Sequence, residues 1–158
     1  MSRTRILILV PVACVALLFV SCSYSTDFVV VNKSNQPIEV LYKVNNNRGP
    51  LASLDKPSTT GVSELNDKGG QNWTPLASNQ YVFDEASRTV TVRLEAGKAL
   101  RVVTMFHYFG HHDPQDAANY PIEYINLTGA SGSVTLAGDQ ARMGFTEGSR
   151  ALYTLTYE

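Results

Sequence analysis

Residues 89–104, TVTVRLEAGKALRVVT, carry the clearest structural signal in this chain of 158 residues. Apolar side chains occupy every second position from Val90 to Leu94, and threonine or charged side chains stand between them. Alternation with a period of two is typical of a strand that buries one face. The Ala96-Gly97 pair then forms a turn, and a second strand region runs from Lys98 to Phe109. We therefore predict a β-hairpin here.

The same kind of pattern recurs along the rest of the chain. Strand-type residues on either side of the polar cluster Lys33–Pro37 predict a second hairpin over residues 27–44. No amphipathic helix of useful length is visible, and seven to nine short strands separated by turn residues predict an all-β domain. The further strands are expected at residues 81–83, 122–127, 133–136, 140–145 and 150–157.

Short antiparallel strands at this spacing favour a β-sandwich of immunoglobulin-like or transthyretin-like appearance. A small closed β-barrel is the alternative. The segment 45–80 is long, irregular and rich in turn formers, and we expect a short helix or strand near residues 62–65. Trp73, the single tryptophan, lies in this segment. It is expected either to cap the core or to contact a partner.

Composition and charge set limits on function. One domain's worth of residues, 44% of them hydrophobic and 17% charged, is enough to build one core. Arg3 and Arg5 precede residue 22, whereas all 14 acidic residues follow it, so the remainder carries a net charge of about −3. Nucleic-acid binding normally requires a basic patch or stripe. None is visible, so we expect no nucleic-acid partner.

Residues 1–21 have the features of a signal peptide. Arg3 and Arg5 form a positive start, and an apolar run follows from Ile6 to Val20. A transmembrane helix needs about 20 apolar residues, and this run is shorter. The order of charge, apolar run and small residue is that of an export signal. An uncleaved membrane anchor is the alternative.

The end of this leader, Leu18–Cys22 (LFVSC), resembles the lipobox of bacterial lipoproteins. Val20 and Ser21 match the small or β-branched residues of that pattern, and Phe19 stands where leucine is preferred. The resemblance implies that Cys22 receives a diacylglycerol thioether, that the leader is cleaved before it, and that its new amine is acylated. The bilayer would then be a partner through Cys22.

The resemblance also implies a location and a division of the chain. Ser23, rather than aspartate, after the cysteine favours the outer membrane where the organism has one. Cys14 would be discarded with the leader, so the folded part would contain no thiol; a free exported thiol at Cys22 is the alternative. We expect residues 1–21 to be the signal peptide, 22–26 the lipidated cysteine and a short tether, and 27–158 a single domain.

The three histidines fall close together. His107, His111 and His112, with Asp113, offer imidazole and carboxylate groups that bind zinc or copper. The spacing matches no metalloenzyme motif such as HExxH. An ordinary solvated turn between Gly110 and Pro114 is the other interpretation.

The motifs of common enzymes are not visible. The sequence contains no GxSxG elbow, no phosphate-binding glycine loop and no cysteine nucleophile in the mature part. We therefore expect a protein that is not an enzyme and holds no cofactor beyond a metal at the histidines.

These observations give two main functional hypotheses; an envelope hydrolase, with His107, His111 or His112 as base, is a third that no motif supports. The first is an exported, membrane-anchored lipoprotein that acts as a binding or structural module of the cell envelope, with an envelope protein as partner. The second is a metal-binding envelope protein that uses His107, His111, His112 and Asp113.

Overall fold

The structure is a computed structural model. It describes residues 24–44, 56–66, 72–107, 120–149 and 152–158. In chain order the elements are β1 (Tyr24–Asn32), β2 (Ile38–Val44), β3 (Ser58–Gly61), the 3₁₀-helix η3 (Val62–Glu64), β4 (Thr74–Pro75), β5 (Tyr81–Asp84), β6 (Thr89–Leu94), β7 (Lys98–His107), β8 (Ile122–Gly129), β9 (Gly132–Ala137), α2 (Asp139–Gly144), β10 (Thr146–Ser149) and β11 (Leu152–Tyr157).

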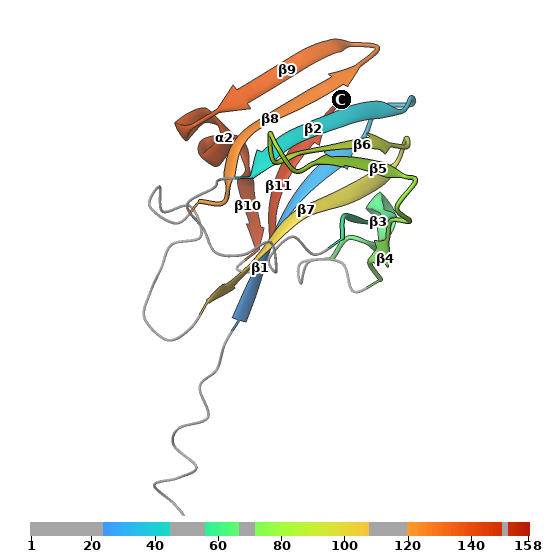
Figure 1. Ribbon diagram of the computed structural model, residues 1–158. Coiled ribbons are helices and arrows are strands. Elements are labelled where there is room, and N and C mark those ends of the chain that lie inside the picture. Colours follow the sequence, from blue (N-terminus) through green and yellow to red (C-terminus); the bar gives the residue numbers. More distant parts are fainter. Residues whose placement is uncertain (1–23, 45–55, 67–71, 108–119, 150–151) are drawn as a thin grey trace, which may run out of the picture.

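The strands form two sheets that pack face to face (Figure 1). Sheet A has the order β10-β11-β1-β7-β3-β4, and sheet B has the order β5-β6-β2-β8-β9. The prediction of an all-β sandwich is confirmed, since the described strands make two separate sheets rather than a closed barrel. The strand pairs are antiparallel except for β1 with β11, where the first and last strands run parallel side by side.

Both predicted hairpins are wrong. β6 pairs with β5 and β2 in sheet B, whereas β7 pairs with β1 and β3 in sheet A. The turn at Gly97, whose φ of +67° suits glycine, therefore carries the chain from one sheet to the other. β1 and β2 are separated in the same way. Alternation tells which face a strand buries, but a strand buries the same face whether the next strand joins its own sheet or the opposite one.

A buried asparagine joins these two crossovers. Asn32, at the end of β1, has no exposed surface. Its Nδ2 atom lies 2.9 Å from the carbonyl oxygen of Gln36, 3.1 Å from that of Leu94 and 3.2 Å from that of Glu95. The backbone N–H of Gly97 donates to the Asn32 carbonyl at 3.0 Å. One residue of the first crossover thus satisfies backbone groups of the second.

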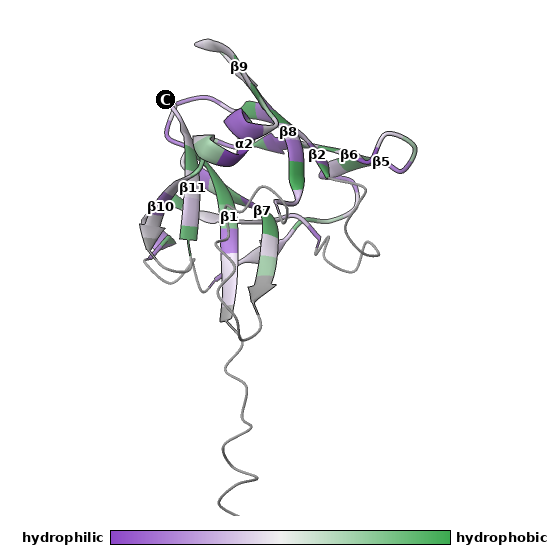
Figure 2. Ribbon diagram, turned by 90° about the vertical axis from the view of Figure 1, so that its left-hand side faces the viewer, coloured by the Kyte–Doolittle hydropathy of each residue, from purple (hydrophilic) through white to green (hydrophobic). Residues whose placement is uncertain are grey.

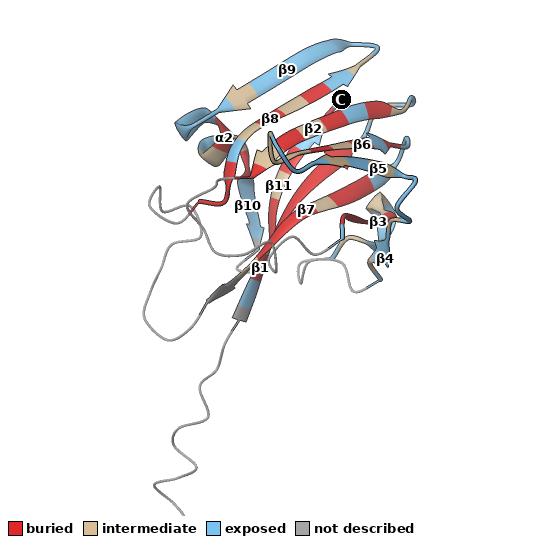
Figure 3. Ribbon diagram, in the orientation of Figure 1, coloured by how far each residue is buried: buried red, intermediate tan, exposed pale blue. Residues whose placement is uncertain are grey.

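The main core lies between the sheets and is centred on Phe28. This ring packs edge-on against Tyr120 and Phe145, each at 5.4 Å between ring centroids, and stacks on Tyr153 at 5.2 Å. Such pairs add to the free energy gained by burying the rings. Figure 3 shows the buried residues concentrated on the central strands of both sheets, and Figure 2 shows the hydrophobic bands along them.

Strand β1 is buried on both faces, because a second cluster covers the outer face of sheet A. This explains the unbroken apolar run FVVV at residues 28–31, since a half-buried strand would alternate. Residues of η3 and its neighbours cover this outer face. The presence of η3 confirms the short element expected near residues 62–65. We call these residues the outer-face cluster: Val29, Val31, Ala99 and Leu152, with Val62, Leu65 and Trp73 packed on them.

The predicted strand at 140–145 is wrong: residues 139–144 form helix α2. Gly138, at a φ of +54°, turns the chain into the helix. Ala141 and Phe145 are buried and stand four residues apart, which is a helical spacing. The Tyr120 hydroxyl donates to the Ala141 carbonyl at 3.1 Å. Residues 140–143 are good helix formers, but the segment is too short for periodicity to separate helix from strand.

Substitution of Asn32 tests the role of the crossover contact. We expect Asn32→Ala to lower the free energy of unfolding by about 3 kcal/mol, because buried carbonyl groups lose their donor. Asn126→Ala is the matched control, since the Asn126 amide donates to Ser133 and Thr135 at a solvent-exposed site. We expect it to cost less than about 1 kcal/mol. Urea unfolding measures both, and equal losses would contradict the role assigned to Asn32.

Candidate functional site

Sheet A begins close to the predicted leader in the sequence. β1 starts at Tyr24, which pairs with His107 at the end of β7. Residues 24–26, predicted to belong to the tether, are therefore part of β1, and Thr26 is fully buried. Their polar sequence did not suggest a strand, but β7 is ten residues long and supplies a partner for them. Cys22 thus stands two residues before the sheet.

Most of the predicted site residues lie outside the described residues. These are Cys22, His111, His112 and Asp113; of the predicted metal ligands only His107 lies in a described element, at the end of β7. The described residues contain no group of three or more His, Cys, Asp or Glu placed to hold a metal ion. The zinc or copper site therefore stays a prediction.

Trp73 lies against sheet A. It is partly buried and packs on the outer-face cluster. The Arg101 guanidinium carbon lies 5.3 Å from the centre of its ring, and Arg101 Nη2 donates to Ser58 Oγ at 3.0 Å. These contacts fit the core-capping interpretation, in which the indole ring and a cation hold β3 and its flanking residues to β7. The partner contact at Trp73 stays a prediction.

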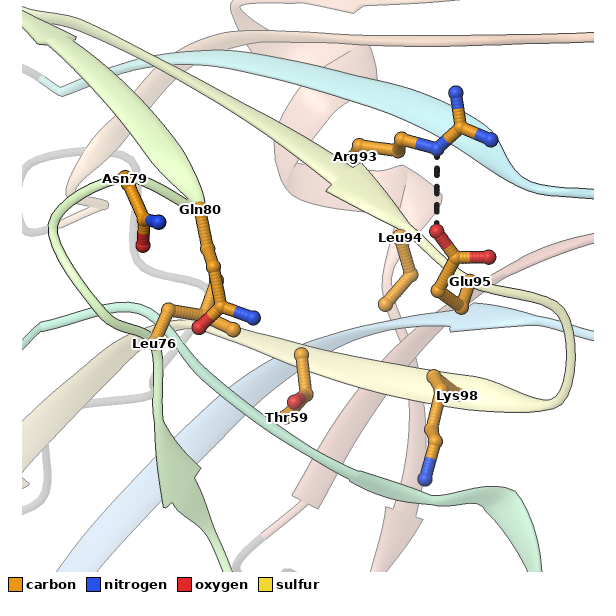
Figure 4. A pocket seen from close by; sticks show the side chains of 8 residues that line it. All are labelled: Thr59, Leu76, Asn79, Gln80, Arg93, Leu94, Glu95 and Lys98. Atoms are coloured by element: carbon orange, nitrogen blue, oxygen red, sulfur yellow. Dashed lines mark hydrogen bonds and ion pairs between the residues drawn. The ribbon is translucent and has the colours of Figure 1, made fainter.

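A pocket opens beside the turn between β6 and β7. Its volume is about 400 Å³. Figure 4 shows that its side chains come from β3, from the loop before β5 and from both sides of that turn. They are Thr59, Leu76, Asn79, Gln80, Arg93, Leu94, Glu95 and Lys98.

The lining of this pocket is polar around two leucines. Arg93 Nε and Glu95 Oε1 are 3.1 Å apart, so these two charges are paired. Gln80 Oε1 accepts from the Ala77 N–H at 2.8 Å, which orients its amide group. Lys98 adds a second cation, and the lining carries one positive charge in excess. Such a set can hydrogen-bond a small polar molecule and favours a negatively charged group on it.

Sequence reasoning missed this pocket. Its residues come from four separate parts of the chain, and none belongs to a motif. The only local signal is the turn at Ala96-Gly97. That turn was predicted, but its crossing between the sheets was not.

Glu64 lies in η3, next in sequence to Leu65 of the outer-face cluster. Thr60 Oγ1 donates to its Oε2 at 2.7 Å, and the Gly61 N–H donates at 3.4 Å. The hydrogen bond from Thr60, followed by that from Gly61, holds the pKa of Glu64 below its ordinary value of 4.5. Both bonds favour the carboxylate form and fix the start of η3.

Within the described part of the chain, no helix has the length and apolar character needed to cross a membrane. Comparisons of the chain with protein-family models, with curated proteins and with solved structures gave no match.

The lowered pKa of Glu64 predicts a pH dependence of stability. A carboxyl group whose pKa falls on folding stabilises the protein above its unfolded pKa of 4.5, and the contribution is lost as the pH falls through the lower folded value. We expect the urea midpoint of unfolding of Glu64→Gln to be lower than that of the wild type at pH 7. The difference between the two midpoints should become smaller towards pH 3.

Glu39→Gln is the matched control for this prediction. Glu39 is exposed on β2, and no hydrogen bond to its side chain is found among the described residues. The substitution removes the same charge without removing such a bond. If the midpoint difference from the wild type stayed constant from pH 7 to pH 3 for both variants, the stabilising role assigned to the hydrogen bonds at Glu64 would be wrong.

Proposed function

We propose that this protein is a membrane-anchored envelope lipoprotein whose β-sandwich acts as a binding or structural module. The observation that carries the proposal is the lipobox-like Leu18–Cys22, which ends two residues before β1. An export signal, an acyl-accepting cysteine and a folded domain thus follow one another without a gap.

The short distance from Cys22 to β1 supports this proposal. An extended chain spans at most about 3.6 Å per residue, so Cys22 lies within about 7 Å of the start of the sheet. One acyl chain gives only marginal membrane binding, whereas two or three hold a protein stably. The end of sheet A where Tyr24 pairs with His107 would then lie at the bilayer surface.

The cysteine content agrees with the proposal. Cys14 and Cys22 are the only cysteines of the chain, and cleavage before Cys22 would leave one, already used by the lipid. The domain would then be stable without disulfides, through the two hydrophobic clusters on either face of β1. The polar pocket beside the β6–β7 turn supplies a surface for the binding role.

Mass spectrometry of the intact protein from the membrane fraction tests the anchor. We expect the wild-type chain to begin at Cys22 and to carry the mass of two or three acyl chains. Cys22→Ser removes the acceptor sulfur, so we expect this variant to lack the acyl mass. Cys14→Ser is the matched control: residue 14 is lost with the leader, so its mature mass should equal that of the wild type.

Two results would contradict the proposal. One is a wild-type protein without acyl mass. The other is acyl mass that persists in Cys22→Ser, since the lipid would then be attached elsewhere.

A further inference from the structure

Three of the four sheet edges carry features that prevent pairing with another strand. β4 has two residues and ends at Pro75. β10 has four residues, includes Glu147 and is irregular in its register with β11. β5 has four residues and ends at Asp84. Short length, proline, charge and bulges are the usual means by which proteins protect a free edge.

The fourth edge, β9, has none of these features. It has six residues, GSVTLA, with no proline and no charged side chain. Its register with β8 is regular from the pair Gly129–Gly132 to the pair Tyr124–Ala137. Nearly all of it is exposed on both faces (Figure 3). Among the described strands, none pairs with its outer side, so the backbone groups there are available for pairing.

The two faces of β9 differ in polarity. Val134 and Leu136 lie on the same face of sheet B as the core residues Leu127 and Ile125, with which they pair. Val134 is 44% exposed. Met143 of α2, the helix packed against β8 and β9, is 71% exposed. Ser133 and Thr135 share the other face, where both accept hydrogen bonds from Asn126. A strand that completed this edge would be apolar on one face and polar but uncharged on the other.

We propose that β9 pairs antiparallel with β9 of a second copy and joins two five-stranded sheets into one of ten strands. Directly opposed residues in an antiparallel pair point to the same face. Pairing centred on Thr135 therefore sets Val134 opposite Leu136 of the second copy, and Ser133 opposite its Ala137. The interface is two-fold symmetric, so each contact occurs twice.

The charge and polarity of β9 fit a second copy as the occupant. β9 carries no charge, so two copies meet without like-charge repulsion. The exposed Val134 is covered by an apolar residue that the chain itself supplies. The pairing also removes both open edges at once, since each strand completes the other.

The position of β9 sets how two copies would lie. Figures 1 and 2 both place β9 at the end of the molecule away from the start of β1, with β8 beneath it. A second copy therefore adds at the far end, and the two starts of β1 point away from each other. If the lipid anchor of the proposed function holds, paired copies belong to two facing membrane surfaces. This consequence rests on the proposed function, whereas the pairing does not.

Sedimentation equilibrium of the purified full chain in mild detergent tests the pairing. We expect a reversible dimer. Val134→Lys sets a charge into the apolar side of the interface in both copies, so we expect the dimer Kd to rise about a hundredfold. Val82→Lys is the matched control, since Val82 is 67% exposed on β5, the other edge of the same sheet. Its Kd should equal that of the wild type.

Amide hydrogen exchange locates the contact in the same samples. We expect the amides of residues 133–137 to become more protected as the protein concentration rises, and those of β5 not to change. Circular dichroism of Val134→Lys should match the wild type, which shows that the variant is folded.

A wild-type protein that stays monomeric at all concentrations would overturn the proposal, as would a dimer that survives Val134→Lys. Protection of β9 that appears only on addition of another protein would also overturn it, because the occupant would then be a foreign strand. A mass spectrum without acyl chains would remove the facing membranes but leave the dimer, so the two proposals fail separately.

Discussion

The fold depends on the buried amide of Asn32, which lies where the chain passes between the two sheets. Its Nδ2 contacts the carbonyl groups of Leu94 and Glu95 at the second crossover, and its Oδ1 accepts from the N–H and hydroxyl of Ser34 at the first. A backbone that leaves a sheet must find other partners for its polar groups. The Asn32 side chain supplies such partners at both crossovers and so links them.

The central position of β1 follows from this arrangement. Because β2 and β6 are led away into sheet B, β1 is free to pair with β7 on one side and β11 on the other. Phe28 then enters the main core, while Val29 and Val31 enter the outer-face cluster. In a lipid-anchored protein, any force on Cys22 would act along a strand that is hydrogen-bonded on both sides.

The candidate sites divide according to the kind of information that specifies them. Cys22 is a candidate from the sequence alone, because the lipobox-like Leu18–Cys22 is a linear pattern that needs no fold to be recognised. The pocket beside the β6–β7 turn could not be predicted, since Thr59 and Lys98 on sheet A meet Gln80, just before β5 of sheet B, only in the folded domain. Trp73 is an intermediate case. Capping of the core was one of the two roles expected for it, but its contact with Arg101 could not be predicted from the sequence.

The sequence by itself determined the strand content and the buried faces, because alternation and apolar runs act locally on each segment. Val90, Val92 and Leu94 face the core as their spacing predicts. It also determined most of the turns, through glycine and polar clusters. Only the tertiary structure decided which strands are neighbours, that 139–144 is a helix, and that β9 is the open edge. These depend on partners distant in sequence: the carbonyl groups that Asn32 reaches, the core that takes Ala141 and Phe145, and the end of the strand order in sheet B.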